Sequence, residues 1–244
     1  MILAGWAWYF TRMLVTSSVY INRPRNSGCL WTRHTTGCSR VSPFSVEAEV
    51  VRDIALQASG MLNPAVGGPS VYPPAPEFLF KKPVSYSTKD WFYSQGTDKY
   101  RRALYTFRYR SVPYPALQTF DAPSGETSCV RRPRSNTPLQ ALTMLNEPVF
   151  LETARSLAKL ALRDGGTTEA EKIAYASGVA DGPRLESAEL LRLLKKEQGL
   201  FAQPGRNPAL FAAADVEGAA AVDAAAWTAV SRVLLNLDET ITKE

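Results

Sequence analysis

The chain has 244 residues, of which 45% are hydrophobic and 21% charged, a composition that is typical of globular proteins and excludes a largely disordered chain. The net charge of +5 comes from 28 Lys and Arg against 23 Asp and Glu, and the basic residues are spread along the sequence. Because nucleic-acid binders gather their basic residues on one face, we expect no nucleic-acid partner. The single histidine, His34, excludes mechanisms that need two.

The N-terminal stretch is apolar and aromatic, MILAGWAWYF. It lacks the basic start and the small-residue cleavage site of a signal peptide and is too short to span a bilayer, and no other segment predicts a membrane span. Apolar residues at helical spacing predict a buried helix over 6–20, followed by a loop over 21–44. A further helix is predicted from Val46, Val50 and Ile54, with Gly60 as its C-terminal cap.

The stretch 61–97 is rich in proline, which forbids long helices, and in aromatic residues, which argue against a flexible linker. We expect an extended segment laid over a helical core and pinned by its rings. After it, residues at helical spacing predict another helix that ends before Pro113: Tyr100, Ala103, Leu104 and Phe107.

Residues 111–135 are predicted as a loop. Thr137 followed by Pro138 is typical of a helix start. One further helix is predicted to start at Pro148 and to end at Gly165 and Gly166, and a short one to start at the capping-box pair Thr168 and Glu171. Leucines indicate another helix up to about residue 201. A last helix is predicted from near Asp223, with Trp227, Val230 and Leu234 on it.

No strand-like alternation of any length is present. The predicted fold is therefore mainly α, an irregular helical domain with long proline-rich and loop connections and no substantial sheet. The expected organisation is a helical domain over 1–202, an Ala/Gly/Pro-rich loop over 203–222, and a C-terminal helix of the same domain over 223–244.

Four stretches together resemble one known family. They are LVTSSVY, VEAEVVRDIALQASGMLNPAVGGPSVYPP, KYRRALYTFRYRSVPYPALQTFDAPSGETSCVRRPRSNTPLQALTMLNEPVFLETARSLA and SRVLLNLDET, and they are similar to the planctomycete-specific domain of unknown function 1553. The resemblance implies the C-terminal domain of a large exported or periplasmic protein, with upstream domains of that same protein as partners, among them a c-type cytochrome-like domain. It supplies no catalytic residues, and the chain has no Cys-x-x-Cys-His haem motif, so we expect no cofactor.

The sequence departs from the family pattern in two ways. It begins inside the usual domain, so we expect a copy that is truncated at its N-terminus. Residues 21–44 also lack the expected acidic-polar block with Asp-Pro and Asn-Arg-Leu-Leu-Ala-Arg. Because a shift of one nucleotide permits that block, our hypothesis is a frameshift here, with a second such stretch at 176–186.

Cys29, His34 and Cys38 are three closely spaced soft ligands. A structural zinc site needs four, and only the distant Cys129 remains, so no metal site is predicted. With three cysteines, one disulfide plus a free thiol and three free thiols both stay open. Cys129 is either a reactive thiol beside arginines or a small buried hydrophobe.

The candidate ligand site is an anion site at a loop–helix corner, because arginine forks and a helix N-terminus both bind anions. Its residues are Arg131, Arg132, Arg134, Asn136 and Thr137. The favoured alternative is structural: the arginines pair with Asp121 and Glu126 of the same loop and fix the corner.

These observations favour an accessory, docking or ligand-binding module of a multidomain exported protein. One alternative is part of an enzyme whose active site is completed by missing upstream domains, since the acids of this chain are scattered. The other is an anion-binding module at the corner from Arg131 to Thr137.

Overall fold

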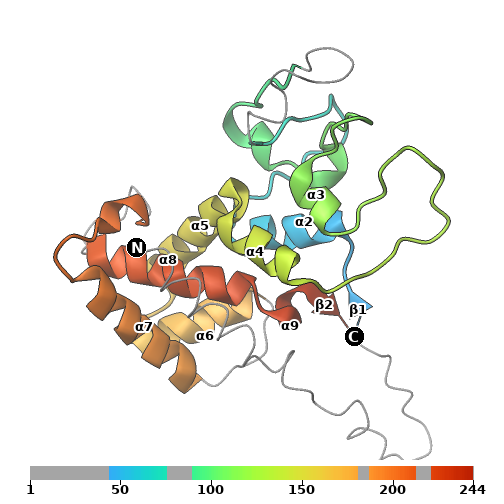
Figure 1. Ribbon diagram of the computed structural model, residues 1–244. Helices are drawn as coiled ribbons and strands as arrows, with labels where there is room; N and C mark the ends of the chain where they lie inside the picture. Colours follow the sequence, from blue (N-terminus) through green and yellow to red (C-terminus); the bar gives the residue numbers. More distant parts are fainter. Residues whose placement is uncertain (1–43, 76–89, 181–186, 213–220, 244) are drawn as a thin grey trace, which may run out of the picture. The chain divides into compact units, whose positions relative to one another are not determined.

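The computed structural model describes residues 44–75, 90–180, 187–212 and 221–243, and this part of the chain is mainly α-helical (Figure 1), as predicted. The predicted helix over 6–20 and nearly all of the predicted loop over 21–44 lie outside the described residues. The α-helices are α2 (Ala48–Ala58), α3 (Pro115–Thr119), α4 (Pro138–Asn146), α5 (Pro148–Asp164), α6 (Glu169–Val179), α7 (Ser187–Phe201), α8 (Ala221–Leu235) and α9 (Asp238–Ile241). The 3₁₀ turns are η2 (Gly96–Tyr100), η3 (Ala103–Tyr105) and η4 (Pro208–Leu210).

A short antiparallel pair joins the two ends of the described part. In it β1 (Phe44–Ser45) pairs with β2 (Thr242–Lys243), with Ser45 opposite Thr242. Among the described residues no helix is both long enough and apolar enough to cross a membrane.

Helix α8 lies at the centre of the helical packing. It packs against α5 and α7 along most of its length and also contacts α4, α6 and η4 (Figure 1). Its sequence is apolar or small nearly all round, and Trp227, Val230 and Leu234 are all buried. A helix without a polar face is stable only when it is enclosed by others, which explains its central place.

Local signals in the sequence fix most helix ends. Gly60, at φ 68°, ends α2. Its N–H donates to Gln57 O at 3.0 Å and the N–H of Met61 donates to Leu56 O at 2.9 Å, the hydrogen bonds of a Schellman cap. Capping boxes open α4 at Thr137 and α6 at Thr168, so these predicted starts are confirmed.

The helix predicted over Tyr100 to Phe107 is wrong. This stretch forms η2 and η3, and its backbone bonds go to the proline-rich segment instead of along a helix. Asn63 N donates to Tyr100 O at 3.0 Å and Val71 N to Tyr105 O at 2.8 Å, while Phe107 N donates to Val71 O at 2.8 Å. Because its prolines leave the proline-rich segment with few internal hydrogen bonds, the segment forms backbone hydrogen bonds with the stretch from Tyr100 to Phe107. The predicted loop over 111–135 likewise contains an unforeseen helix, α3, which begins at Pro115.

Aromatic side chains pin the proline-rich segment, as predicted, where the structure describes it. Three successive carbonyls accept hydrogen bonds from aromatic side chains, of which Trp91 and Tyr114 are buried and Tyr93 is exposed. Trp91 Nε1 donates to Pro73 O at 2.8 Å, and Tyr93 OH donates to Ala75 O at 2.9 Å. The hydroxyl of Tyr114 lies 3.0 Å from the carbonyl between them, Pro74 O.

Two buried arginines hold the rest of this region. Arg52 of α2 donates from Nη1 to Arg101 O and from Nη2 to Lys99 O, both at 2.7 Å. Arg101 in turn donates to the carbonyls of Pro69 at 2.9 Å and Ala65 at 3.3 Å, and also to that of Gly67. A buried guanidinium must have hydrogen-bond partners, and here backbone carbonyls supply them.

We expect Gly60→Ala to destabilise the protein by roughly 1–2 kcal/mol, because a β-carbon is disfavoured in the left-handed conformation. The matched control is Gly178→Ala in α6, where an added β-carbon meets no atom within 4 Å and alanine gains up to about 1 kcal/mol of helix propensity. Urea unfolding measures both. Equal midpoints for the two variants would contradict the prediction.

Candidate functional site at a loop–helix corner

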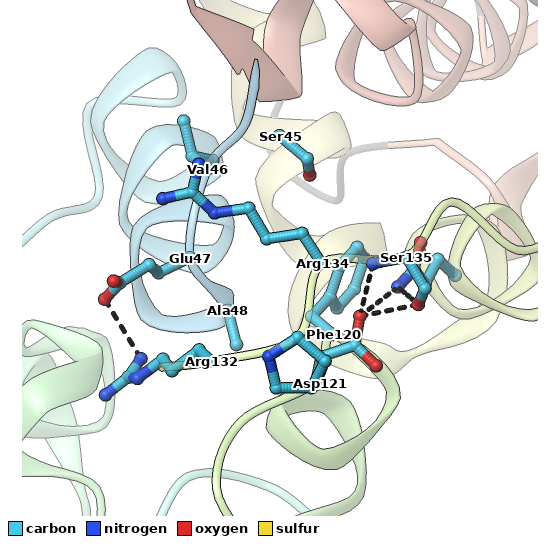
Figure 2. Close-up of a pocket in the computed structure, with 11 residues that line it drawn as sticks. Ser45, Val46, Glu47, Ala48, Phe120, Asp121, Arg132, Arg134 and Ser135 are labelled. Atoms are coloured by element: carbon cyan, nitrogen blue, oxygen red, sulfur yellow. Dashed lines mark hydrogen bonds and ion pairs between the residues drawn. The ribbon is translucent and has the colours of Figure 1, made fainter. Parts of the chain in front are cut away.

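The predicted site residues lie in the connection from α3 to α4, beside the first turn of α2 (Figure 2). Asp121 begins this connection with φ 61°, a conformation that few residues other than glycine adopt but that aspartate tolerates. Its carboxylate Oδ2 accepts hydrogen bonds from Ser135 N at 2.8 Å and Ser135 Oγ at 2.5 Å. Asp121 therefore ties the start of the loop to its end.

Gln140 completes the corner from inside α4. Its side chain is buried, and Nε2 donates to Thr119 O at 3.1 Å and to Ser135 Oγ at 3.2 Å. Its Oε1 accepts from Thr137 N at 3.1 Å, while its own N–H donates to Thr137 Oγ1 at 3.4 Å. The polar groups at the start of α4 are thus already largely satisfied within the chain.

Arg132 lies against the start of α2. Its Nη1 is 2.6 Å from Glu49 Oε2 and 3.0 Å from Glu47 Oε2. The hydrogen bond that Arg132 donates to Glu49 raises the pKa of Arg132, and the charges of both glutamates add to this effect. The expected pairing of this arginine with Asp121 or Glu126 is therefore wrong, because acids that are distant in sequence are nearer in the fold.

The other predicted site residues are not drawn together as one cluster. Arg131 and Asn136 are exposed, and Asn136 Nδ2 lies 3.4 Å from Asp238 Oδ1 beside α9. Figure 2 shows the Arg134 side chain reaching toward Val46. Cys129 is an exposed thiol, so it is not a buried hydrophobe, and its reactivity stays a prediction.

Two hollows meet at this corner and share Asp121 and Ser135. The smaller one lies between the first turn of α2 and the loop and includes Val46, Phe120 and Arg132 in its lining (Figure 2). The larger is an open groove of about 510 Å³ between α3 and the start of α4. Its lining consists of Pro113, Pro115, Gln118, Thr119, Asp121, Ser135, Thr137 and Leu139.

A buried polar cluster escaped the sequence analysis. Tyr114, at the N-cap of α3, has its hydroxyl 2.6 Å from Glu147 Oε1, and Arg52 acts on both by its charge. The available signal was Arg52 itself, which follows Val51 on the apolar stripe of α2. A charged residue at such a position indicates a buried partner elsewhere in the fold.

The metal prediction concerned residues that the structure largely leaves out. Cys29, His34 and Cys38 lie outside the described residues. Within the ranges that are described, no three His, Cys, Asp or Glu side chains are grouped in a way that would hold a metal ion.

Residues 4–195 match the family described as "Protein of unknown function (DUF1553)". This match covers most of the chain, so the protein belongs to that family, as the sequence resemblance predicted. No curated protein matches the chain, and no solved structure matches it either.

We expect Gln140→Glu to destabilise the chain by about 1–3 kcal/mol at neutral pH, because it buries a carboxylate against that of Asp121 and removes the donor to Thr119. The loss should shrink at acidic pH, where carboxyl groups become neutral. Adding Asp121→Asn removes the opposing charge and keeps a side chain that tolerates positive φ, so the double variant should recover part of the loss. Urea unfolding at pH 4 and pH 7 measures this, and an additive double variant would contradict it.

Proposed function

We propose that this chain is a docking module of a multidomain protein and that the groove between α3 and α4 receives an apolar segment from another domain of the same protein. The observation that carries this proposal is an exposed apolar strip beside the groove. Leu139 of α4 is 59% exposed and lines the groove together with Pro113 and Pro115, and Leu142 of the same helix is 53% exposed.

The two leucines belong to the outer face of a short helix. They are three residues apart and therefore neighbours on one face of α4, whereas its inner face is formed by Gln140, Met144 and Leu145. Each exposed leucine alone would be unremarkable. Their adjacency to a proline-lined groove favours an interaction surface.

Polar groups border this apolar strip in the way that is typical of protein interfaces. Gln118 and Thr119 line the groove on the α3 side, and Ser135 and Thr137 line it on the α4 side. Such a border orients a bound segment, while the leucines and prolines provide most of the binding energy.

The identity of the partner rests on the family resemblance. We propose upstream domains of the same full-length protein as the partner, including a c-type cytochrome-like domain, and an exported or periplasmic location for that parent protein. The docking surface would then serve to hold neighbouring domains in a fixed arrangement.

Because Leu139 lines the groove, Leu139→Glu should weaken binding of the separately expressed upstream part about tenfold or more, since burying an unpaired carboxylate costs well over the 1.4 kcal/mol that tenfold represents. The matched control is Leu104→Glu, because Leu104 is 70% exposed on η3 and lies outside the groove lining. Titration followed by NMR suits a weak complex. Equal weakening by both variants, or by neither, would rule out this surface.

An anion-binding module at the same corner is the second candidate. It is supported by exposed Arg131 and Arg134 close to the start of α4. It ranks behind docking because Arg132 is paired with Glu47 and Glu49 and because Thr137 and Gln140 already cap the helix.

An anion module should gain thermal stability from sulfate or phosphate, by about 2.7 kcal/mol at a hundredfold excess over Kd. Replacing Arg131 and Arg132 together by alanine should abolish that gain. Arg192→Ala in α7 serves as the control, because Arg192 is exposed and far from the corner in sequence. A gain that is equal in all three proteins would exclude this function.

A further inference from the structure

The Tyr114 hydroxyl faces two acceptors with a single hydrogen. It lies 2.6 Å from Glu147 Oε1 and 3.0 Å from Pro74 O. A carbonyl oxygen only accepts, and a phenol carries one hydrogen. Both contacts are hydrogen bonds at the same time only when the carboxyl group of Glu147 carries a proton and donates it to Tyr114.

The surroundings of Glu147 decide whether it can hold that proton. Burial raises the pKa of Glu147, and the hydrogen bond from Tyr114 and the charge of Arg52 from α2 offset only part of this effect. Glu152 of α5 raises the pKa of Glu147 further, although Lys99 and Tyr100 of η2 hold the Glu152 carboxylate. Arg52 acts on Glu147 through its charge, while its two Nη atoms donate to the carbonyls of Arg101 and Lys99.

Tyr114 itself does not titrate in the same range. Burial raises its pKa well above the usual value, and the negative charge of Glu147 adds to this. Of these two groups, the carboxyl of Glu147 is therefore the one that loses its proton first as pH rises.

We propose that Glu147, Tyr114 and Pro74 form a pH-sensitive latch on the proline-rich segment. With Glu147 neutral, the carboxyl donates to the Tyr114 oxygen and Tyr114 donates to the Pro74 carbonyl. When Glu147 releases its proton to solvent, the hydroxyl turns to the carboxylate and the Pro74 carbonyl loses its donor.

The neighbouring anchors do not respond to this change. Pro73 O and Ala75 O accept hydrogen bonds from Trp91 Nε1 and the Tyr93 hydroxyl, and neither of these hydrogen bonds involves Glu147. Ionisation of Glu147 thus loosens the middle one of three successive carbonyls, and the segment is held most firmly at low pH.

The stability effect has a defined sign. The folded chain favours the neutral carboxyl, so the pKa of Glu147 is higher in the folded chain than in the unfolded chain, where it is about 4.3. At pH values between these two pKa values the unfolded chain binds fewer protons than the folded chain. Stability from this group is therefore complete below about pH 4.3 and is lost as pH rises through the folded pKa.

The direct test is a titration of the Glu147 carboxyl carbon by NMR in the full chain. We expect the wild-type carboxyl to titrate above the usual glutamate value. Urea midpoints measured from pH 4 to pH 8 should fall less steeply in Glu147→Gln, whose amide donates to Tyr114 at every pH. Glu189→Gln in α7 is the matched control and should retain a wild-type slope of midpoint against pH, because this exposed glutamate pairs with Arg192 and is not among the groups that act on Glu147.

Two results would overturn the latch. One is a Glu147 carboxyl in the wild-type chain that titrates at or below the ordinary glutamate value, which needs no variant to fold. The other is a Glu147→Gln protein that keeps the wild-type slope. A flatter slope in Glu147→Gln, with Glu189→Gln unchanged, supports it.

Discussion

The part of the proline-rich segment that the structure describes has few backbone hydrogen bonds within itself, so side chains must satisfy its carbonyls. Arg101 donates to the carbonyls of Ala65, Gly67 and Pro69. Aromatic side chains face the three successive carbonyls that begin with Pro73. Arg101 can do so because Arg52 holds its own backbone carbonyl from α2. The need to satisfy these carbonyls thus couples α2, η2, η3, α3 and the proline-rich segment. It also explains why two arginines are buried without carboxylate partners at hydrogen-bond distance.

Sequence patterns predicted those parts of the fold that depend on local interactions. The ends of α2, α4 and α6 follow from Gly60 and from two capping boxes, each formed within a few residues. The pattern failed between Tyr100 and Phe107, where apolar residues have helical spacing but the backbone pairs with the distant segment. The spacing of apolar residues indicates which side chains would share a helix face. It does not reveal that a segment some thirty-five residues earlier in the chain competes for the same backbone hydrogen bonds.

The same distinction applies to the candidate site. That Thr137 begins a helix could be predicted, because Pro138 follows it at the first helical position. That Arg132 binds Glu49 could not, since the two are 83 residues apart and closer acids were available in the loop. The cluster of Arg52, Tyr114 and Glu147 is likewise assembled from three elements, and only the position of Arg52 within an apolar stripe pointed to it.

The size of the apolar strip on α4 bears on what kind of partner it suits. Complete burial of one leucine contributes about 1.5–3 kcal/mol, and both Leu139 and Leu142 are already about half covered. Their combined contribution of roughly 2–3 kcal/mol lies below the 4–15 kcal/mol that association of two free proteins costs. A partner domain on the same chain avoids most of that cost, because a short linker keeps it at an effective concentration near the millimolar range. A surface this small is therefore better matched to a tethered neighbour than to a freely diffusing protein, which is the strongest physical reason for placing the partner within the same polypeptide.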